Sequence, residues 1–191
     1  PTVQRTLEWM SEAYFGMAPF TVQPGVNVPI PIRVDHPTEV GADRLCNVVA
    51  GVALYGKPLI VVDFGTATNF DVVNARGEFV GGAIAPGLMV AAEALVSRAA
   101  RLSRVEIVRP KEAIGRNTTT NIQSGVVYGY AGLVDGLVQR MRQELDGDVR
   151  IVATGGLAEQ MREVAQSIQE VNANLRLEGL RMIWESANPP A

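Results

Sequence analysis

The amino-acid sequence predicts an α/β fold, and three observations support this expectation. First, segments whose apolar residues recur at helical spacing alternate with short apolar runs typical of buried strands. Second, three such runs, at residues 59–64, 68–73 and 78–84, follow one another with only tight turns between them, which predicts three antiparallel neighbours. Third, helical segments separate these runs from further strand patterns at residues 104–108 and 148–156, as crossover connections require.

The remaining elements follow along the chain. Residues 2–16 are expected to form a helix that stops at Gly16, and residues 19–25 a short strand with a turn. Prolines and β-branched residues keep residues 26–37 extended, because proline lacks a backbone N–H and clashes inside a helix. Further helices are expected at residues 40–56, 87–102, 117–145, 157–168 and 179–186, with a short strand at 175–177.

The predicted helix at residues 117–145 is long and rich in glycine. Its expected apolar stripe consists of Ile122, Val126, Gly129, Leu133, Leu137 and Met141. A glycine inside a helix costs about 1 kcal/mol relative to alanine, so a structural reason is expected for Gly125, Gly129, Gly132 and Gly136. We interpret these glycines as positions of close packing against another backbone, with a contact between two copies of the chain as an extension of this interpretation.

Composition excludes several classes of protein. The net charge of −3 argues against nucleic-acid binding, which needs a surplus of Lys and Arg on one face. No apolar run reaches the roughly 18 residues that a membrane span needs. Cys46 is the only cysteine and His36 the only histidine. The sequence therefore has too few of these residues for a disulfide framework or a zinc cluster, and only one candidate for the histidine of a Ser-His-Asp triad. His36 is expected in a loop, and the reducing cytoplasm is the expected location.

The turn between the first two predicted strands carries more polar residues than a hairpin requires. Asp63 ends the first strand, and Gly65, Thr66 and Thr68 follow it. Glycine lets the backbone approach a ligand closely, and backbone N–H groups and threonine hydroxyls can donate to phosphate oxygens. Asp63 is an acceptor only, which suits a cation or a water beside those phosphates. An ordinary hairpin with a capping acid is the alternative.

A second segment, Gly41-Ala42-Asp43-Arg44, opens a predicted helix. If it is functional, Asp43 accepts a proton from an attacking hydroxyl, as in phosphoryl transfer, where the acid mostly orients the hydroxyl. The alternative is that Asp43 only complements the helix dipole.

Two further glycine-containing segments also precede helices. Gly155 and Gly156 can let a phosphate or a flat ligand lie against the backbone, although a plain strand-to-helix turn explains them equally well. Asn117 or Thr118, after Gly115, can be an ordinary N-cap. Neither a Walker-type loop nor a dinucleotide-binding glycine motif occurs in the sequence.

Taken together, these motifs closely resemble the type III pantothenate kinase family, also labelled Bvg accessory factor-like. The match spans Pro1 to Trp184 and is carried by PTEVGADRLCNVVAG, LIVVDFGTATNFDVV, FVGGAIAPGL, GRNTTTNIQSG and IVATGGLA. The resemblance implies a ribonuclease-H-like fold of the actin-like kinase type. Residues 1–57 would be the remainder of an incomplete N-terminal half-domain, and residues 58–191 a complete C-terminal half-domain.

The resemblance also implies an activity, the phosphorylation of pantothenate by ATP with Mg²⁺ in coenzyme A biosynthesis. Members of the family work as homodimers and need a monovalent cation, potassium or ammonium. By matching position, Asp43 resembles the proton acceptor for the pantothenate hydroxyl. The substrate pocket would then consist of Gly41, Ala42, Asp43, Arg44 and Thr118. ATP contacts would fall on Gly65, Thr66, Thr68, Gly155 and Gly156, and the metal ligand would be Asp63.

Two departures from the family pattern accompany this resemblance. The Asp-x-Gly-Asn-Thr phosphate loop that family members usually carry near the N-terminus has no match here, so we expect the chain to be a fragment that lacks this segment. In addition, Val34 stands seven residues before Gly41, where many members have a substrate-contacting Tyr.

Two other functions are alternatives. A non-catalytic accessory or regulatory protein on the same scaffold agrees with the missing phosphate loop, but gives no chemical reason to keep Asp43, Arg44 and Asp63 together. Another actin-like ATPase or a sugar kinase would show no dependence on pantothenate.

Overall fold

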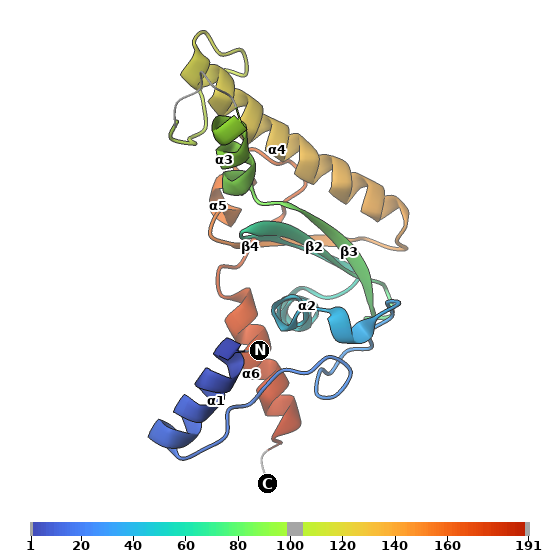
Figure 1. Cartoon of the computed structure of the whole chain (residues 1–191). Helices are drawn as coiled ribbons and strands as arrows, with labels where there is room; N and C mark the ends of the chain where they lie inside the picture. The colour runs from blue at the N-terminus through green and yellow to red at the C-terminus, as the bar shows by residue number, and fades with distance from the viewer. Residues whose placement is uncertain (1, 99–104, 190–191) are drawn as a thin grey trace.

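In the computed structural model, which describes residues 2–98 and 105–189, a five-stranded sheet separates two layers of helices (Figure 1). Its strands are β1 (Leu59–Phe64), β2 (Ala67–Val73), β3 (Phe79–Pro86), β4 (Arg150–Gly155) and β5 (Glu170–Val171), in the order β3-β2-β1-β4-β5. β1, β2 and β3 are antiparallel neighbours, whereas β4 is parallel to β1 and β5 to β4. This meander followed by parallel crossovers is one ribonuclease-H-like half, which confirms the predicted fold class.

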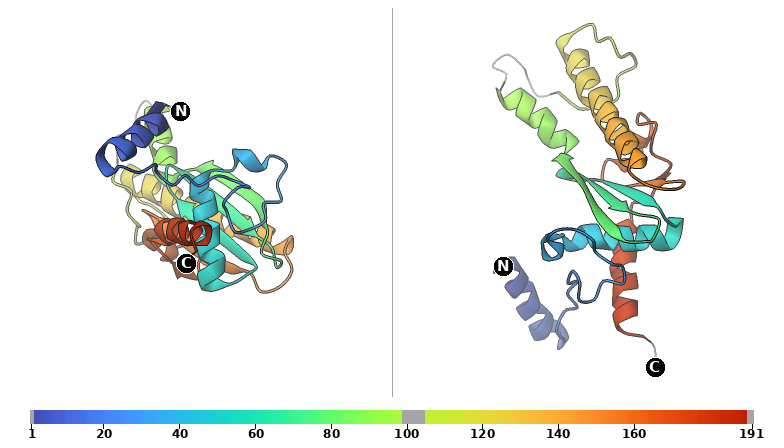
Figure 2. Two further views of the ribbon diagram at one scale, coloured as in Figure 1. Left: turned by 90° about the horizontal axis from the view of Figure 1, so that it is seen from below. Right: turned by 90° about the vertical axis from the view of Figure 1, so that its right-hand side faces the viewer.

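The helices are distributed over both faces of the sheet. They are α1 (Thr2–Phe15), the short 3₁₀ helix η1 (Pro37–Glu39), α2 (Ala42–Tyr55), α3 (Leu88–Arg98), α4 (Thr118–Gln143), α5 (Ala158–Arg162) and α6 (Leu175–Ala187). α4, together with α3 and α5, lies on one face (Figure 1). α2 lies on the opposite face and is crossed by α6 (Figures 1 and 2).

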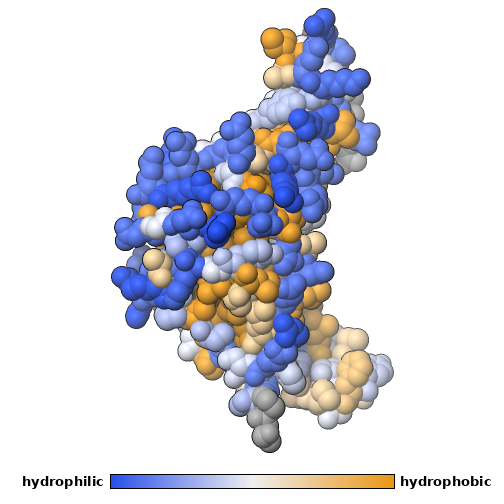
Figure 3. Space-filling model, turned by 180° about the vertical axis from the view of Figure 1, so that it is seen from behind, coloured by the Kyte–Doolittle hydropathy of each residue, from blue (hydrophilic) through white to orange (hydrophobic). Residues whose placement is uncertain are grey.

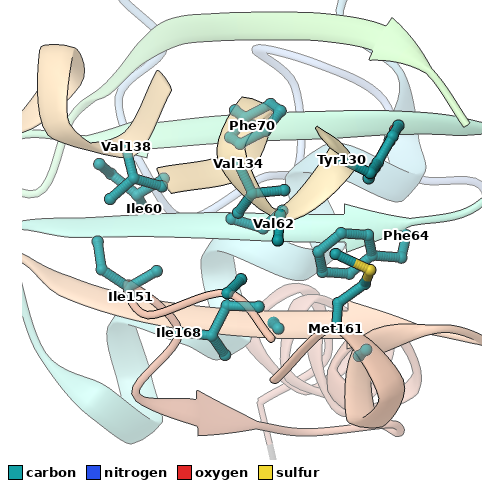
Figure 4. Packing of buried hydrophobic residues seen from close by; sticks show 14 of the residues in the cluster. Ile60, Val62, Phe64, Phe70, Tyr130, Val134, Val138, Ile151, Met161 and Ile168 are labelled. Atoms are coloured by element: carbon teal, nitrogen blue, oxygen red, sulfur yellow. The ribbon is translucent and has the colours of Figure 1, made fainter. Parts of the chain in front are cut away.

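β1 is buried along its whole length, because both of its faces are covered. Ile60, Val62 and Phe64 point toward α4, and Leu59 and Val61 point toward α2. Figure 4 shows the first group against the α4 side chains Tyr130, Val134 and Val138. The alternation of β1 therefore places Asp63 on the same face as α2.

The buried face of α4 differs from the predicted stripe. Buried residues include Ile122, Val127, Tyr130, Val134 and Val138, whereas Val126, Leu133, Leu137 and Met141 are only partly buried. The helix lies along the sheet with a wide apolar face, and the prediction found one border of that face rather than its centre. The close packing expected at the glycines is not found among the described residues, because a Cβ at Gly125, Gly129 or Gly132 would have nothing there within 4 Å.

The strands predicted at residues 19–25 and 104–108 are absent from the described residues. In the segment 19–25, the Asn27 side chain takes the backbone groups that a strand would pair: its Nδ2 donates to the Thr21 carbonyl at 2.9 Å, and its Oδ1 accepts from the Gln23 N–H at 2.8 Å. Residues 105–108 form no strand, and the Glu106 carbonyl accepts from Gln123 Nε2 at 2.8 Å. Residues 99–104, which include ends of two predicted elements, lie outside the described residues.

The C-terminal elements are displaced relative to the prediction. α5 stops at Arg162, because Asp135 of α4 accepts the backbone N–H groups of Gln166 and Ser167 at 3.1 and 2.8 Å. The last strand is residues 170–171, beside β4, and not 175–177. Residues 175–177 instead form the first turn of α6. The prediction was wrong here because a short apolar pair does not by itself distinguish a strand from a helix.

α1 is helical as predicted but projects from the rest of the chain (Figures 1 and 2). Its large apolar side chains are exposed, namely Val3, Leu7, Trp9, Met10, Tyr14 and Phe15. Figure 3 shows apolar residues gathered around α1 and α6, where Leu177 and Trp184 are also exposed.

None of the described helices combines the length and the apolar character that a membrane span requires. α2 packs on the same sheet as the C-terminal elements, and the predicted division at residue 57 stays a prediction.

α2 and α6 cross at Gly179, where a Cβ would overlap the carbonyl group of Cys46. Gly179→Ala is therefore expected to lower the free energy of unfolding by about 2 kcal/mol, because overlap outweighs the gain in helix propensity. Gly156→Ala is the control at a position where a Cβ would meet nothing within 4 Å, so the same change should leave the free energy of unfolding nearly unchanged. Urea unfolding followed by circular dichroism measures both, and equal effects would contradict the close crossing.

Candidate active site

The candidate site lies where β1 and β4 end. These strands are parallel neighbours, so their carboxyl ends meet at one edge, and ligands of α/β sheets bind at such edges. Gly65 follows β1, and Gly156 follows the last residue of β4, Gly155. α2 returns to β1 through a short connection, which brings the N-terminus of α2 to the same edge. Three of the predicted motifs therefore meet there.

Asp63 is the buried centre of this edge, with only 3% of its surface exposed. Its Oδ2 accepts two hydrogen bonds, from Asn47 Nδ2 of α2 at 2.8 Å and from a terminal guanidinium nitrogen of Arg176 of α6 at 2.5 Å. Asp63 thus joins the strand to both helices of the α2 face.

A second buried ion pair lies beside it on β2. Asp71 is fully buried, and Arg44 Nε of α2 donates to its Oδ1 at 2.5 Å. Burial raises the pKa of Asp71 to about 6, although the charge of Arg44 opposes this shift. The Arg44 guanidinium also lies 5.4 Å from the centre of the Phe79 ring, a cation–π contact. Arg44 is therefore held by the sheet and leaves its neighbour Asp43 at the surface.

Asp43 is exposed in the first turn of α2. Its Oδ1 accepts a hydrogen bond from the Arg44 N–H at 3.0 Å, so the carboxylate folds back over the helix N-terminus. Gly41 makes this room, because a Cβ there would lie 2.5 Å from Asp43 Oδ1. The charge of Asp43 contributes to raising the pKa of Asp71 and of the buried Cys46 thiol, and in both cases burial is the larger cause. Asp43 therefore lies within electrostatic reach of the buried pairs.

The two glycine bends differ in what they leave open. In the first, Gly65 and Thr66 are exposed, and the Thr66 carbonyl accepts from the Gly87 N–H at 2.9 Å, which fixes the bend from one side. In the second, Gly155 has φ of 92°, and a Cβ there would lie 2.7 Å from Asp63 Oδ1. A Cβ at Gly156 would meet nothing within 4 Å. Gly155 thus serves packing, while Gly156 faces open space.

Two predicted site residues do not join this group. Thr68 is fully buried on the α4 face, where its hydroxyl lies 2.6 Å from the Tyr130 hydroxyl in a hydrogen bond. Thr118 begins α4 beside its N-cap Asn117, at the end of α4 that projects beyond the sheet and away from α2 (Figure 1). Val34 packs in the apolar cluster under α2 and lies close to Gly81.

Sequence reasoning missed three residues of the site, Asn47, Asp71 and Arg176. Asn47 and Asp71 carried a usable signal, because a polar residue inside an apolar helix face or an apolar strand needs a partner. Arg176 carried none, since its segment was predicted to be a strand.

The raised pKa of Asp71 predicts a specific dependence of stability on pH. The folded state holds the proton of Asp71 more tightly than the unfolded chain does. The stability that this proton contributes is therefore fully present below the ordinary pKa of 3.8, and it is lost as the pH rises through about 6. Asp71→Asn removes the titration but keeps an acceptor for Arg44. We expect the free energy of unfolding of the wild type minus that of this variant to fall as the pH rises from 3.8 to about 6, and to be constant outside this range. Urea unfolding measures both values.

The control for this pH experiment is Asp35→Asn, at an exposed loop position. A constant difference for Asp71→Asn would show that Asp71 does not titrate there.

Comparison with known proteins identifies relatives over nearly the whole chain. The sequence profile of the family described as "Type III pantothenate kinase" matches residues 1–140. A protein of that name from Acidobacterium capsulatum is 54% identical over 97% of this chain and 68% of its own length. Those from Koribacter versatilis and Geobacter sulfurreducens are both 51% identical over 97% of this chain, and over 68% and 72% of their own lengths.

A solved structure from Campylobacter jejuni, described as a conserved putative Baf family transcriptional activator, has the same fold. Its TM-score is 0.58 at 20% sequence identity, over 85% of this chain and 72% of that chain. The profile match over most of the chain and the identities above 50% establish the relationship: the chain belongs to the type III pantothenate kinase family.

Proposed function

We propose that the protein is an ATP-dependent kinase that phosphorylates pantothenate to 4'-phosphopantothenate, the first step of coenzyme A biosynthesis. The observation that carries this proposal is the exposed Asp43 at the N-terminus of α2, at the sheet edge where both glycine bends end, in a chain of this family. A non-catalytic role on the same scaffold would leave unexplained why the neighbouring Arg44 is anchored on a buried carboxylate while Asp43 is presented at the surface.

Asp43 is proposed to orient the pantothenate hydroxyl and to accept its proton. Its carboxylate lies at the surface, and its hydrogen bond to the Arg44 N–H uses one oxygen and leaves the other for a substrate. In phosphoryl transfer the transition state is loose, so positioning of the hydroxyl matters more than the strength of the base. Gly41 and Ala42 would form the adjacent wall of the pocket.

Thr118 belongs to this pocket only if a second copy supplies it, because within one chain it begins α4 on the other face of the sheet (Figure 1). We therefore propose a homodimer, as the family resemblance implies. The open face of α4 supports this proposal, since a Cβ at Gly125, Gly129 or Gly132 would meet nothing within 4 Å in the part of the chain that the structure describes.

ATP is proposed to lie along the two bends, with its phosphates near Gly65, Thr66 and Gly156. Thr68 and Gly155 would support these contacts from below, because the first is bonded to Tyr130 and the second packs against Asp63. Mg²⁺ is usually held by one or two carboxylates and the substrate phosphates. Among the described residues no group of three or more His, Cys, Asp or Glu could hold a metal ion, which agrees with Mg²⁺ arriving with the nucleotide.

The potassium or ammonium ion that the resemblance assigns to Asp63 fits its surroundings poorly. Both hydrogen-bond partners of that carboxylate are N–H donors, and one of them is already a cation. For the reaction itself we propose the cytoplasm as the location.

The proposed role of Asp43 is tested by Asp43→Asn in an assay of pantothenate phosphorylation with ATP and Mg²⁺. The amide keeps an acceptor for the Arg44 N–H, so the fold should be unchanged, whereas kcat should fall by a factor of about 100 to 10,000 because proton acceptance is lost. Asp35→Asn is the control at an exposed loop position. Full activity of Asp43→Asn would remove Asp43 from the mechanism.

The proposed ATP contact is tested by a pair of neighbouring substitutions. Gly156→Ala should leave the melting temperature unchanged and raise KM for ATP severalfold, with KM for pantothenate unaffected, because the new methyl enters the proposed phosphate site. Gly155→Ala should instead destabilise the protein by about 2 kcal/mol, because its φ of 92° is unfavourable for alanine and the methyl would approach Asp63. An unchanged KM for ATP in Gly156→Ala would exclude this bend from the nucleotide site.

A further inference from the structure

The carboxylate of Asp63 needs a positive charge, and the structure shows where that charge comes from. A buried ion is costly unless a counter-charge and hydrogen bonds compensate it. Asn47 supplies a neutral hydrogen bond at 2.8 Å, and Arg176 supplies a charged one at 2.5 Å, both to the same oxygen. The side chain of Asp63 is only 4% exposed, whereas that of Arg176 is 51% exposed, so the guanidinium reaches the buried carboxylate from the surface.

The position of Arg176 is unfavourable for its own helix. It is the second residue of α6, where the helix dipole presents its positive end and favours acidic side chains. The N-cap residue Asn174 makes no side-chain capping bond that would offset this. The placement of a cation there is explained by Asp63, the only acidic side chain to which Arg176 is bonded within the described part of the chain.

A metal ion at Asp63 would find few ligands. Hard cations are held by shells of oxygen atoms, commonly six or more. One further oxygen could bind an ion, since Asn47 Oδ1 is buried without a hydrogen-bond partner among the described residues. Against it, the backbone of Gly155 closes on Asp63 Oδ1, as the 2.7 Å distance of a Cβ there shows. A guanidinium already occupies Oδ2, and a second cation beside it would be repelled.

We propose that Arg176 takes the place of a monovalent cation at Asp63, so that the protein needs no potassium or ammonium at this carboxylate. The planar guanidinium carries the same single charge, is always protonated and brings its own hydrogen bonds. As part of the chain it is present at any salt composition. The inference concerns the proposed nucleotide site, but the binding of a cation to Asp63 is measurable whether or not the proposed reaction takes place.

The test compares melting temperatures in potassium chloride with those in tetramethylammonium chloride at equal ionic strength. The large organic cation cannot enter a buried site, so a difference between the salts reports specific binding of potassium. For the wild type we expect no difference. Arg176→Gln should melt lower in both salts and recover by about 3 °C or more in potassium, with saturation, because the freed Asp63 then binds the ion.

Two control variants accompany this measurement. Arg181→Ala removes an arginine of the same helix that is paired only with Glu185 at the surface, and it should stay indifferent to potassium. Arg176→Lys keeps the charge and should also stay indifferent. If Arg176→Gln does not fold, titration of the wild type with potassium, followed by tryptophan fluorescence, decides the question alone.

Two results would overturn the proposal. One is a potassium-specific, saturable stabilisation or fluorescence change of the wild type itself. The other is an Arg176→Gln variant that folds but responds to potassium no more than the wild type does. In a kinase assay the same proposal requires wild-type turnover that is equal in the two salts. A complete lack of turnover in every variant would count against the proposed reaction and would leave the melting result to decide about Arg176.

Discussion

The structure of the site depends on the compensation of two buried carboxylates on one face of the sheet. Asp63 of β1 and Asp71 of β2 are each bonded to an arginine from a helix, Arg176 of α6 and Arg44 of α2. A buried ion pair such as Asp71–Arg44 adds little to stability compared with apolar residues of similar size, but breaking it by removing one partner costs about 3–5 kcal/mol. Such pairs therefore determine positions, and here they determine where α2 and α6 begin relative to the end of the sheet.

This constraint explains how an exposed residue can be placed accurately. Asp43 has no packing of its own, yet the next residue is anchored to Asp71, and Asn47 one turn later is anchored to Asp63. α2 cannot rotate or slide without breaking one of these bonds. The close crossing with α6 at Gly179 holds the helix from its other side. The surface carboxylate thus inherits its position from buried contacts, which is how a rigid scaffold presents a reactive group.

The sequence predicted the parts of this arrangement that local patterns encode. The strands at β1, β2, β3 and β4 and the helix α2, with its stop at Gly56, were predicted to within two residues, because apolar periodicity and glycine signals are local. The strands predicted at residues 19–25 and 175–177 failed where contacts between distant residues decide the outcome, as with the Asn27 side chain and the start of α6. For the same reason Asp43 and Asp63 were found from their motifs, whereas Arg176 lies 113 positions from its partner and could not be.

The same pairing determines what a nucleotide would meet at this edge of the sheet. Arg44 and Arg176 are both neutralised by carboxylates inside the protein, and Asp43 adds a negative charge at the surface. The charged side chains at this edge of the sheet therefore do little to attract a polyanion such as ATP. The attraction has to come from backbone N–H groups at the helix N-terminus and at the bends, where glycine leaves them uncovered, and from a divalent ion that accompanies the phosphates. Glycine and threonine, and no lysine, therefore mark the proposed nucleotide site, in contrast to loops in which a lysine side chain binds the phosphates.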